Sequence, residues 1–106
     1  EFAAAQPAEV ERVRQMILAT EVFGFVGCCH AISQLDLTEQ ISAIEKPTQI
    51  IVGSDDEGTP VAAHEVIRDQ IKGSELCILK GARHLSNIES VDEFNQALVA
   101  FLDRQA

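Results

Sequence analysis

The stretch Thr48-Gln49-Ile50-Ile51-Val52-Gly53 decides the fold class of this chain. Its residues are β-branched and nearly all apolar, which is typical of a strand covered on both faces in a parallel sheet. Thr59-Pro60 follows a short loop and suits a helix start, with Thr59 as the N-cap and Pro60 at the first helical position. We therefore expect a strand followed by a helix, which is the beginning of an α/β unit.

The residues that follow predict the body of that helix, then a second strand and a last helix. Glu75 to Leu79 has the composition of a strand, and Gly81 breaks it. Because a helix separates the two strands, they should pair in parallel through a right-handed crossover. Apolar residues at helical spacing before Gly73 predict the intervening helix: Val61, Ala63, Val66, Ile67 and Ile71. After Ser90 and Glu93, spaced as a capping box, the last helix is expected to bury Val91, Phe94, Leu98, Phe101 and Leu102.

The N-terminal half is predicted to be helical. A helix should run from Pro7 to about Thr20, where apolar residues recur at helical spacing. The stretch from Phe23 to Ile32 is small and apolar throughout, which predicts a buried element, a helix that begins after Gly24. A short helix is expected from about Leu37 to Ala43, and the joint with the strand-containing half lies near Lys46-Pro47.

Length and charge exclude several classes of protein. The chain has 106 residues, 46% of them hydrophobic and 24% charged, which excludes a disordered chain. Its 17 acidic and 8 basic residues give a net charge of −9, the wrong sign for neutralising nucleic-acid phosphates or anionic lipid. We expect no nucleic-acid partner and no membrane partner. No apolar run approaches the ~20 residues of a membrane span, and three cysteines suit a cytoplasmic protein.

Titratable side chains follow both predicted strands. Asp55, Asp56 and Glu57 come after the first strand, and the segment from Lys80 to His84 comes after the second. Parallel neighbours lie ~4.8 Å apart and end at the same edge of the sheet, so an Asp of one loop can meet His84 of the other. A buried carboxylate facing a histidine is the orienting half of a nucleophile–base–acid triad. On spacing alone, a solvated acidic turn and a surface histidine remain the alternative.

Both loops resemble known motifs. Residues 53–60, Gly-Ser-Asp-Asp-Glu-Gly-Thr-Pro, resemble the segment that carries the acid of α/β-hydrolases, and residues 81–89 resemble their catalytic-histidine loop. Together with residues 24–29, 93–95 and 97–98, the second loop is similar to one subgroup, the 3-oxoadipate enol-lactonases of aromatic degradation by the β-ketoadipate route. The resemblance implies that residues 1–46 are the end of a helical cap with connecting helices. Residues 47–106 would be the last two strands and helices of the α/β-hydrolase core.

The resemblance also implies roles for individual side chains. Asp56 would be the triad acid, chosen over its neighbour Asp55 by the spacing of the family motif, and His84 would be the general base. Arg12, Arg14 and Arg83 are candidate contacts for an anionic substrate, with solvated surface charge as the alternative. No metal and no organic cofactor is expected.

The nucleophile is missing from the sequence, which contains no Gly-x-Ser-x-Gly pentapeptide. We therefore expect the C-terminal part of a longer serine hydrolase, inactive alone, that converts 3-oxoadipate enol-lactone to 3-oxoadipate. Its partners would be the small-molecule lactone and the missing N-terminal part. The alternatives are another hydrolase of the superfamily or a non-catalytic, oligomeric binding or assembly module. In either case we expect a homo-oligomer, associating through the free edge of the Thr48–Gly53 strand or through residues 23–32.

Two further features have weaker claims to function. Cys28-Cys29-His30 could suggest a metal or redox site with His64 or Cys77, but Cys-x-x-Cys and paired-His spacings are absent. Small thiols packed under the cap are the favoured explanation, ahead of a cysteine nucleophile. His64 lies within a predicted helix and is expected at its surface or boundary.

Overall fold

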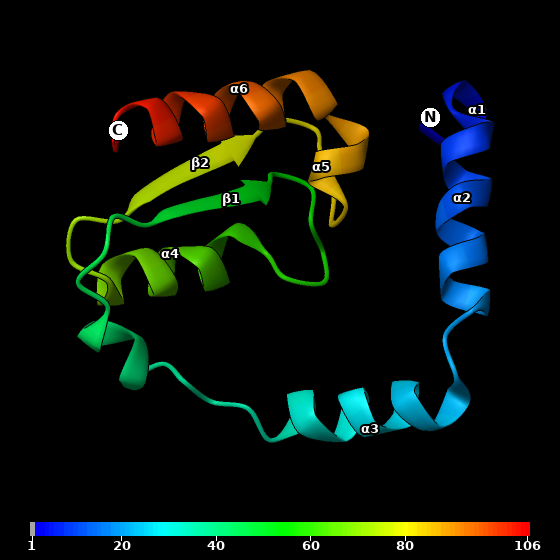
Figure 1. Ribbon diagram of the computed structural model, residues 1–106, viewed down its shortest axis with the longest axis horizontal. Coiled ribbons are helices and arrows are strands. Elements are labelled where there is room, and N and C mark those ends of the chain that lie inside the picture. Colours follow the sequence, from blue (N-terminus) through cyan, green and yellow to red (C-terminus); the bar gives the residue numbers. More distant parts are fainter. Residues whose placement is uncertain (1) are drawn as a thin grey trace. The chain divides into compact units, whose positions relative to one another are not determined.

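The computed structural model describes residues 2–106, and the chain divides into two compact units, Glu1–Asp36 and Leu37–Ala106 (Figure 1). The boundary between the units precedes the joint expected near Lys46-Pro47. The reason is that residues 40–43 form a short helix that contacts the helix of residues 61–70, within the second unit.

The first unit consists of helices α1 (Phe2–Ala5), α2 (Pro7–Leu18) and α3 (Val22–Ser33). Pro7 occupies the first turn of α2, as predicted. No single helix within residues 2–106 is long and apolar enough to cross a membrane. Helices α2 and α3 meet the length and composition criteria only as a pair, with a bend of 91° between them.

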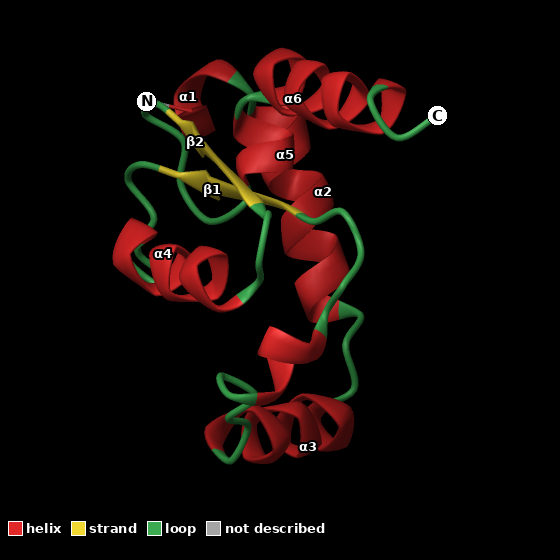
Figure 2. Cartoon of the chain, turned by 90° about the vertical axis from the view of Figure 1, so that its left-hand side faces the viewer, coloured by secondary structure: helices red, strands yellow, loops and turns green. Residues whose placement is uncertain are grey.

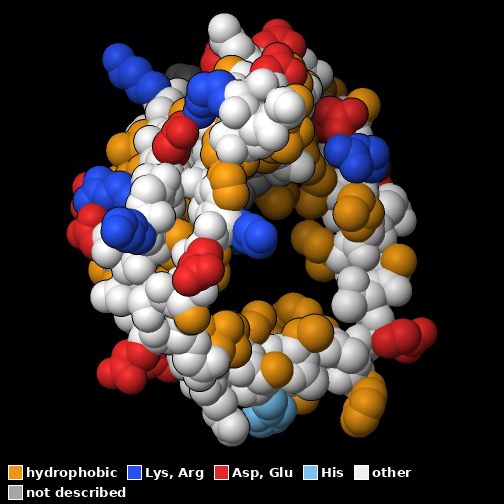
Figure 3. Space-filling view, turned by 60° about the vertical axis from the view of Figure 1, so that its left-hand side comes forward, with side chains coloured by type: hydrophobic (Ala, Val, Ile, Leu, Met, Phe, Trp, Pro, Cys, Tyr) orange, Lys and Arg blue, Asp and Glu red, His pale blue; other side chains and the backbone are white. Residues whose placement is uncertain are grey.

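Helix α3 confirms the predicted helix but not its predicted burial. It begins at Val22, so Gly24 lies inside the helix and does not precede it. None of its residues is buried, and Phe23 is 91% exposed. The expectation of a buried element is therefore wrong for this chain, since the described helices of this unit bury none of their residues. Figure 3 shows many apolar side chains at the surface.

The second unit contains the sheet. It comprises the 3₁₀ helix η1 (Gln40–Ala43), strand β1 (Gln49–Gly53), helix α4 (Val61–Gln70), strand β2 (Glu75–Leu79), and helices α5 (Ser86–Glu89) and α6 (Val91–Asp103). The two strands are parallel, as predicted, with Gln49 opposite Glu75 and Gly53 opposite Leu79. Helix α4 covers one face of the sheet and α6 the other (Figure 2). The buried apolar residues are Ile50, Val52, Ile71, Leu79 and Ala82.

Helix α6 packs less deeply than the sequence predicted. Phe94 and Phe101 are half-buried, whereas Val91 is 48% and Leu102 53% exposed. The two strands have five residues each, so the sheet is too small to cover the whole apolar stripe of a longer helix. Ser90 precedes α6 at the cap position, but its side chain makes no cap hydrogen bond.

Three other local predictions differ from the structure. The helix expected from Leu37 to Ala43 is shorter and is the 3₁₀ helix η1. The short helix α5 was not predicted. The N-cap of α4 is Pro60 rather than Thr59, and no side chain caps this helix. The hydroxyl of Thr59 instead donates to the carboxylate of Asp56.

Candidate active site

The loops after β1 and β2 cross in close contact at the carboxyl edge of the sheet. The backbone N–H of Asp55 donates to the carbonyl of Ala82 at 2.9 Å, and the N–H of Gly81 donates to Ser54 Oγ at 2.8 Å. A Cβ atom on Gly53 would lie 2.1 Å from the carbonyl oxygen of Ala82, so only glycine permits this approach. The crossing fixes the position of Asp56, which follows Asp55, relative to His84, which lies two residues after Ala82.

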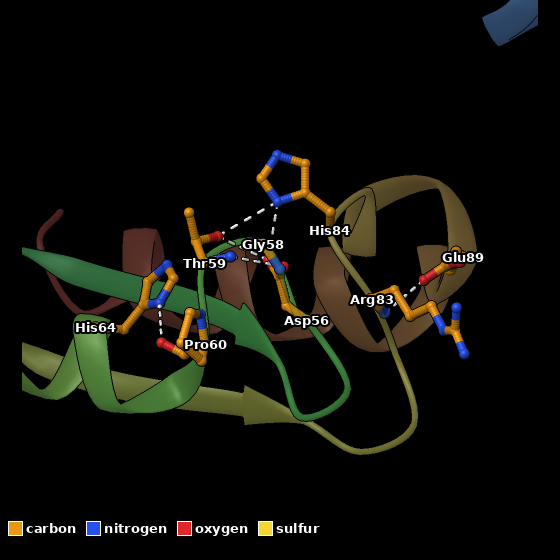
Figure 4. Close-up of polar contacts among 8 residues, drawn as sticks. All are labelled: Asp56, Gly58, Thr59, Pro60, His64, Arg83, His84 and Glu89. Atoms are coloured by element: carbon orange, nitrogen blue, oxygen red, sulfur yellow. Dashed lines mark hydrogen bonds and ion pairs between the residues drawn. The ribbon is translucent and has the colours of Figure 1, made fainter. Parts of the chain in front are cut away.

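Asp56 lies at this crossing, and its carboxylate accepts four hydrogen bonds (Figure 4). Its Oδ1 accepts the backbone N–H groups of Gly58 and Thr59, both at 2.9 Å. Its Oδ2 accepts the hydroxyl of Thr59 at 2.8 Å and Nδ1 of His84 at 2.9 Å. Asp56 is 7% exposed, so a buried carboxylate is fully hydrogen-bonded and directed at a histidine.

The hydrogen bonds keep Asp56 ionised. The N–H of Thr59 makes the largest contribution to lowering the pKa of Asp56 well below its ordinary value; burial opposes the shift, and His84, the Thr59 hydroxyl and the Gly58 N–H add to it. Because Oδ2 is a carboxylate oxygen, Nδ1 of His84 must carry the proton that it shares. This tautomer leaves Nε2 as an acceptor. Figure 4 shows Nε2 pointing away from Asp56, on a side chain that is 67% exposed.

Asp56→Asn should make the stability of the full-length protein less sensitive to acid. A carboxyl whose pKa is lower in the folded than in the unfolded state stabilises the fold at neutral pH, and this stabilisation is lost as the pH falls below the unfolded value of about 4. We expect urea denaturation of the variant to show a lower free energy of unfolding at pH 7 and a shallower decline between about pH 5 and pH 2. Asp55→Asn, at an exposed neighbour, is the control and should decline as the wild type does. Equal declines for all three proteins would contradict the prediction.

The other candidate residues lie outside this contact. Arg83 is exposed, donates its backbone N–H to Glu89 and extends away from His84 in Figure 4. Arg12 and Arg14 lie on α2 in the other unit, where they form ion pairs with Glu9 and Glu11.

His64, Cys28 and Cys29 lie apart from the Asp56–His84 contact. Nδ1 of His64 donates to the carbonyl of Pro60 at 3.2 Å, at the N-terminus of α4. Cys28 and Cys29 are exposed free thiols. No group of three or more His, Cys, Asp or Glu side chains that could hold a metal ion occurs within residues 2–106.

Sequence reasoning missed the part that Thr59 plays in the site. Thr59-Pro60 has the form of a helix start, and that pattern accounted for the threonine completely. The signal that could have revealed the contact is the Asp-x-x-Thr spacing, because an Asp side chain commonly bonds backbone groups two and three residues further on. Those bonds bring the threonine hydroxyl back to the carboxylate.

Comparison with known proteins identifies the fold. No family model matches the chain. The chain is 31% identical over 97% of its length to 3-oxoadipate enol-lactonase 2 of Acinetobacter baylyi, and it covers 38% of that protein. It is 40% identical over 92% of its length to a proline iminopeptidase of Thermoplasma volcanium, of which it covers 32%. The solved enol-lactonase of Burkholderia xenovorans matches 96% of the chain with a TM-score of 0.92 and 28% identity; the chain covers 39% of it.

The chain has a parallel strand pair with a helix on each face, and it matches solved α/β-hydrolases. Its fold is therefore the C-terminal portion of an α/β-hydrolase fold. Within that class the chain resembles the 3-oxoadipate enol-lactonases, and it is also similar to proline iminopeptidases. The relatives are hydrolases, and the chain spans less than two fifths of the length of those given above: 38%, 32% and 39%.

Proposed function

We propose that this chain supplies the acid and the general base of a serine-dependent carboxylic-ester hydrolase. The observation that carries the proposal is the 2.9 Å contact between Asp56 Oδ2 and His84 Nδ1, made by a buried, ionised carboxylate at the carboxyl edge of the sheet. Such an edge is where ligands and reactive groups gather in open α/β sheets. Because the sequence has no Gly-x-Ser-x-Gly pentapeptide, the nucleophile would come from a part of the protein outside this sequence.

In the proposed mechanism His84 moves protons through Nε2. It takes the proton of the serine hydroxyl as the serine oxygen attacks the lactone carbonyl. The ring C–O bond then breaks, and His84 returns the proton to the enol oxygen that leaves. Water then attacks the acyl-serine while His84 takes its proton; the acyl C–O bond to serine breaks, His84 returns that proton to the serine oxygen, and the carboxylic acid formed loses its proton to solvent. Asp56 remains ionised, holds the tautomer of His84 and stabilises the imidazolium.

We propose 3-oxoadipate enol-lactone as the substrate of the whole protein. The relatives named for this reaction match nearly the whole chain, 97% of it in sequence and 96% of it in structure. The lactone is an anion, so the guanidinium groups of Arg12, Arg14 and Arg83 are proposed contacts for its carboxylate. Proline iminopeptidases match the chain as well, and their name indicates that they cleave a peptide bond, which is an amide. Amides are therefore the competing class of substrate.

The test is an assay of the full-length protein with the enol-lactone, a simple p-nitrophenyl ester and a prolyl amide. We expect the lactone to give the highest kcat/KM of the three substrates. A fluorophosphonate, which reacts with activated serines, should label one serine that lies outside residues 1–106. Preferred turnover of the prolyl amide would overturn the substrate. Absence of fluorophosphonate labelling, together with no turnover, would overturn the class of enzyme.

A further inference from the structure

The proposed function gives no role to the side chain of Thr59, although this side chain contacts both members of the Asp56–His84 pair. Its Oγ1 lies 2.8 Å from Asp56 Oδ2 and 3.3 Å from His84 Nδ1 (Figure 4). Thr59 Oγ1 therefore contacts both Asp56 Oδ2 and His84 Nδ1, the two atoms that share the Nδ1 proton.

The hydrogen-bond directions follow from the number of protons available. Nδ1 of His84 already donates to Asp56, so it cannot accept from Thr59. The single hydroxyl proton of Thr59 therefore goes to Asp56 Oδ2, the nearer partner. A lone pair of the same hydroxyl oxygen then faces the Nδ1–H group, as a second, weaker acceptor beside the carboxylate.

A helix-capping role does not account for this hydroxyl. The N-cap of α4 is Pro60, and no side-chain cap hydrogen bond is made there. Pro60 disfavours the helical region of the backbone for Thr59, because the proline ring clashes with the preceding residue there. The Thr59 N–H also donates to Asp56 Oδ1, so Thr59 contacts both carboxylate oxygens.

We propose that Thr59 is a positioning residue, whose hydroxyl holds the carboxylate oxygen of Asp56 that receives the Nδ1 proton of His84. Without the hydroxyl, Oδ2 keeps only His84 as a donor, and the carboxylate plane is no longer fixed on that side. The imidazole would then lose its alignment toward the serine. This proposal rests on the proposed function for its kinetic consequence but not for its geometry.

The test compares Thr59→Val with Thr59→Ser in the full-length protein. Valine preserves the shape and the backbone N–H but removes the hydroxyl, whereas serine keeps the hydroxyl. Misplacement of a catalytic group costs up to roughly 100-fold in rate. We therefore expect Thr59→Val to lower kcat roughly 10- to 100-fold with KM unchanged, since the Thr59 hydroxyl acts through Asp56 and His84. Thr59→Ser should remain close to wild type.

A second measurement does not depend on turnover. The proton on His84 Nδ1 should give a low-field NMR signal in the wild type and in Thr59→Ser, and this signal should be lost to faster exchange in Thr59→Val. Thr48→Val is the matched control, because it removes a 2.9 Å hydroxyl bond to the carbonyl of Lys46 in the same unit. It should change neither readout.

Two results would overturn the positioning role: a wild-type signal and kcat in Thr59→Val, or equal losses in the valine and serine variants. Thr59→Ala replaces the valine variant if thermal unfolding shows that the latter does not fold. If the wild type hydrolyses none of the substrates, the proposed function fails, and the NMR comparison still decides the role of Thr59.

Discussion

His84→Ala in the full-length protein should lower kcat for lactone hydrolysis by roughly 10⁴- to 10⁶-fold. Nε2 of His84 is the base that the mechanism uses in both the acylation and the deacylation steps, and no other histidine contacts Asp56 among the hydrogen bonds of residues 2–106. The fold should survive, because the His84 side chain is 67% exposed and buries little apolar surface. The measurement is steady-state kinetics beside a thermal unfolding curve.

His64→Ala is the matched control for this prediction. It removes an imidazole from the same unit, and the hydrogen bond of His64 among the described residues is to the carbonyl of Pro60, at the N-terminus of its own helix. We expect its kcat to stay within a few fold of the wild type. If His84→Ala kept wild-type turnover, or if both variants lost activity equally, His84 would have no part as the base.

Gly53→Ala should be the most destabilising single change in the sheet. The added Cβ would lie 2.1 Å from the carbonyl oxygen of Ala82, 2.5 Å from its carbonyl carbon and 2.6 Å from the carbonyl oxygen of Arg83. All three atoms are backbone, so no flexible side chain can move aside, and the loop that carries His84 must shift. Overpacking typically costs about 1–3 kcal/mol and occasionally more, and we expect the upper end of that range here because backbone atoms must move. Urea denaturation should show that loss, and the low-field Nδ1 proton of His84 should disappear.

Gly58→Ala is the control for the glycine prediction. Its Cβ would meet Asp56 Oδ1 at 3.4 Å, an ordinary van der Waals contact. We therefore expect a change in the free energy of unfolding below about 1 kcal/mol. A Gly53→Ala protein as stable as Gly58→Ala would show that the two loops do not need their close contact.

The sheet was predictable from the sequence because its signals are local. The β-branched run before Gly53 specifies a strand wherever it packs, and the predicted range Glu75 to Leu79 is the observed β2. Parallel pairing followed from the helix between them. Since both strands end at one edge, the meeting of Asp56 and His84 could also be anticipated.

Burial and hydrogen-bond assignment could not be predicted in the same way. Whether residues 23–32 are buried depends on which other surface packs against them. The sequence pattern of α3 carries no information about that surface. Thr59 fits both a helix cap and a carboxylate partner, and only the three-dimensional path of the loop decides between them. The proposed substrate contacts of Arg12 and Arg14 depend on long-range placement, about which helical spacing carries no information.

The crossing of the loops at Gly53 and Ala82 has a consequence for how such chains tolerate insertions. Asp56 directly follows the residue whose N–H bonds Ala82, and His84 lies just beyond Ala82. An extra residue between Gly53 and Asp56, or between Leu79 and His84, would rotate one of the two side chains out of reach. At the opposite end of the sheet the turn between α4 and β2 includes Gly73, with a φ of +79°, and carries neither Asp56 nor His84. Length variation among related hydrolases should therefore concentrate in that turn and avoid the carboxyl edge.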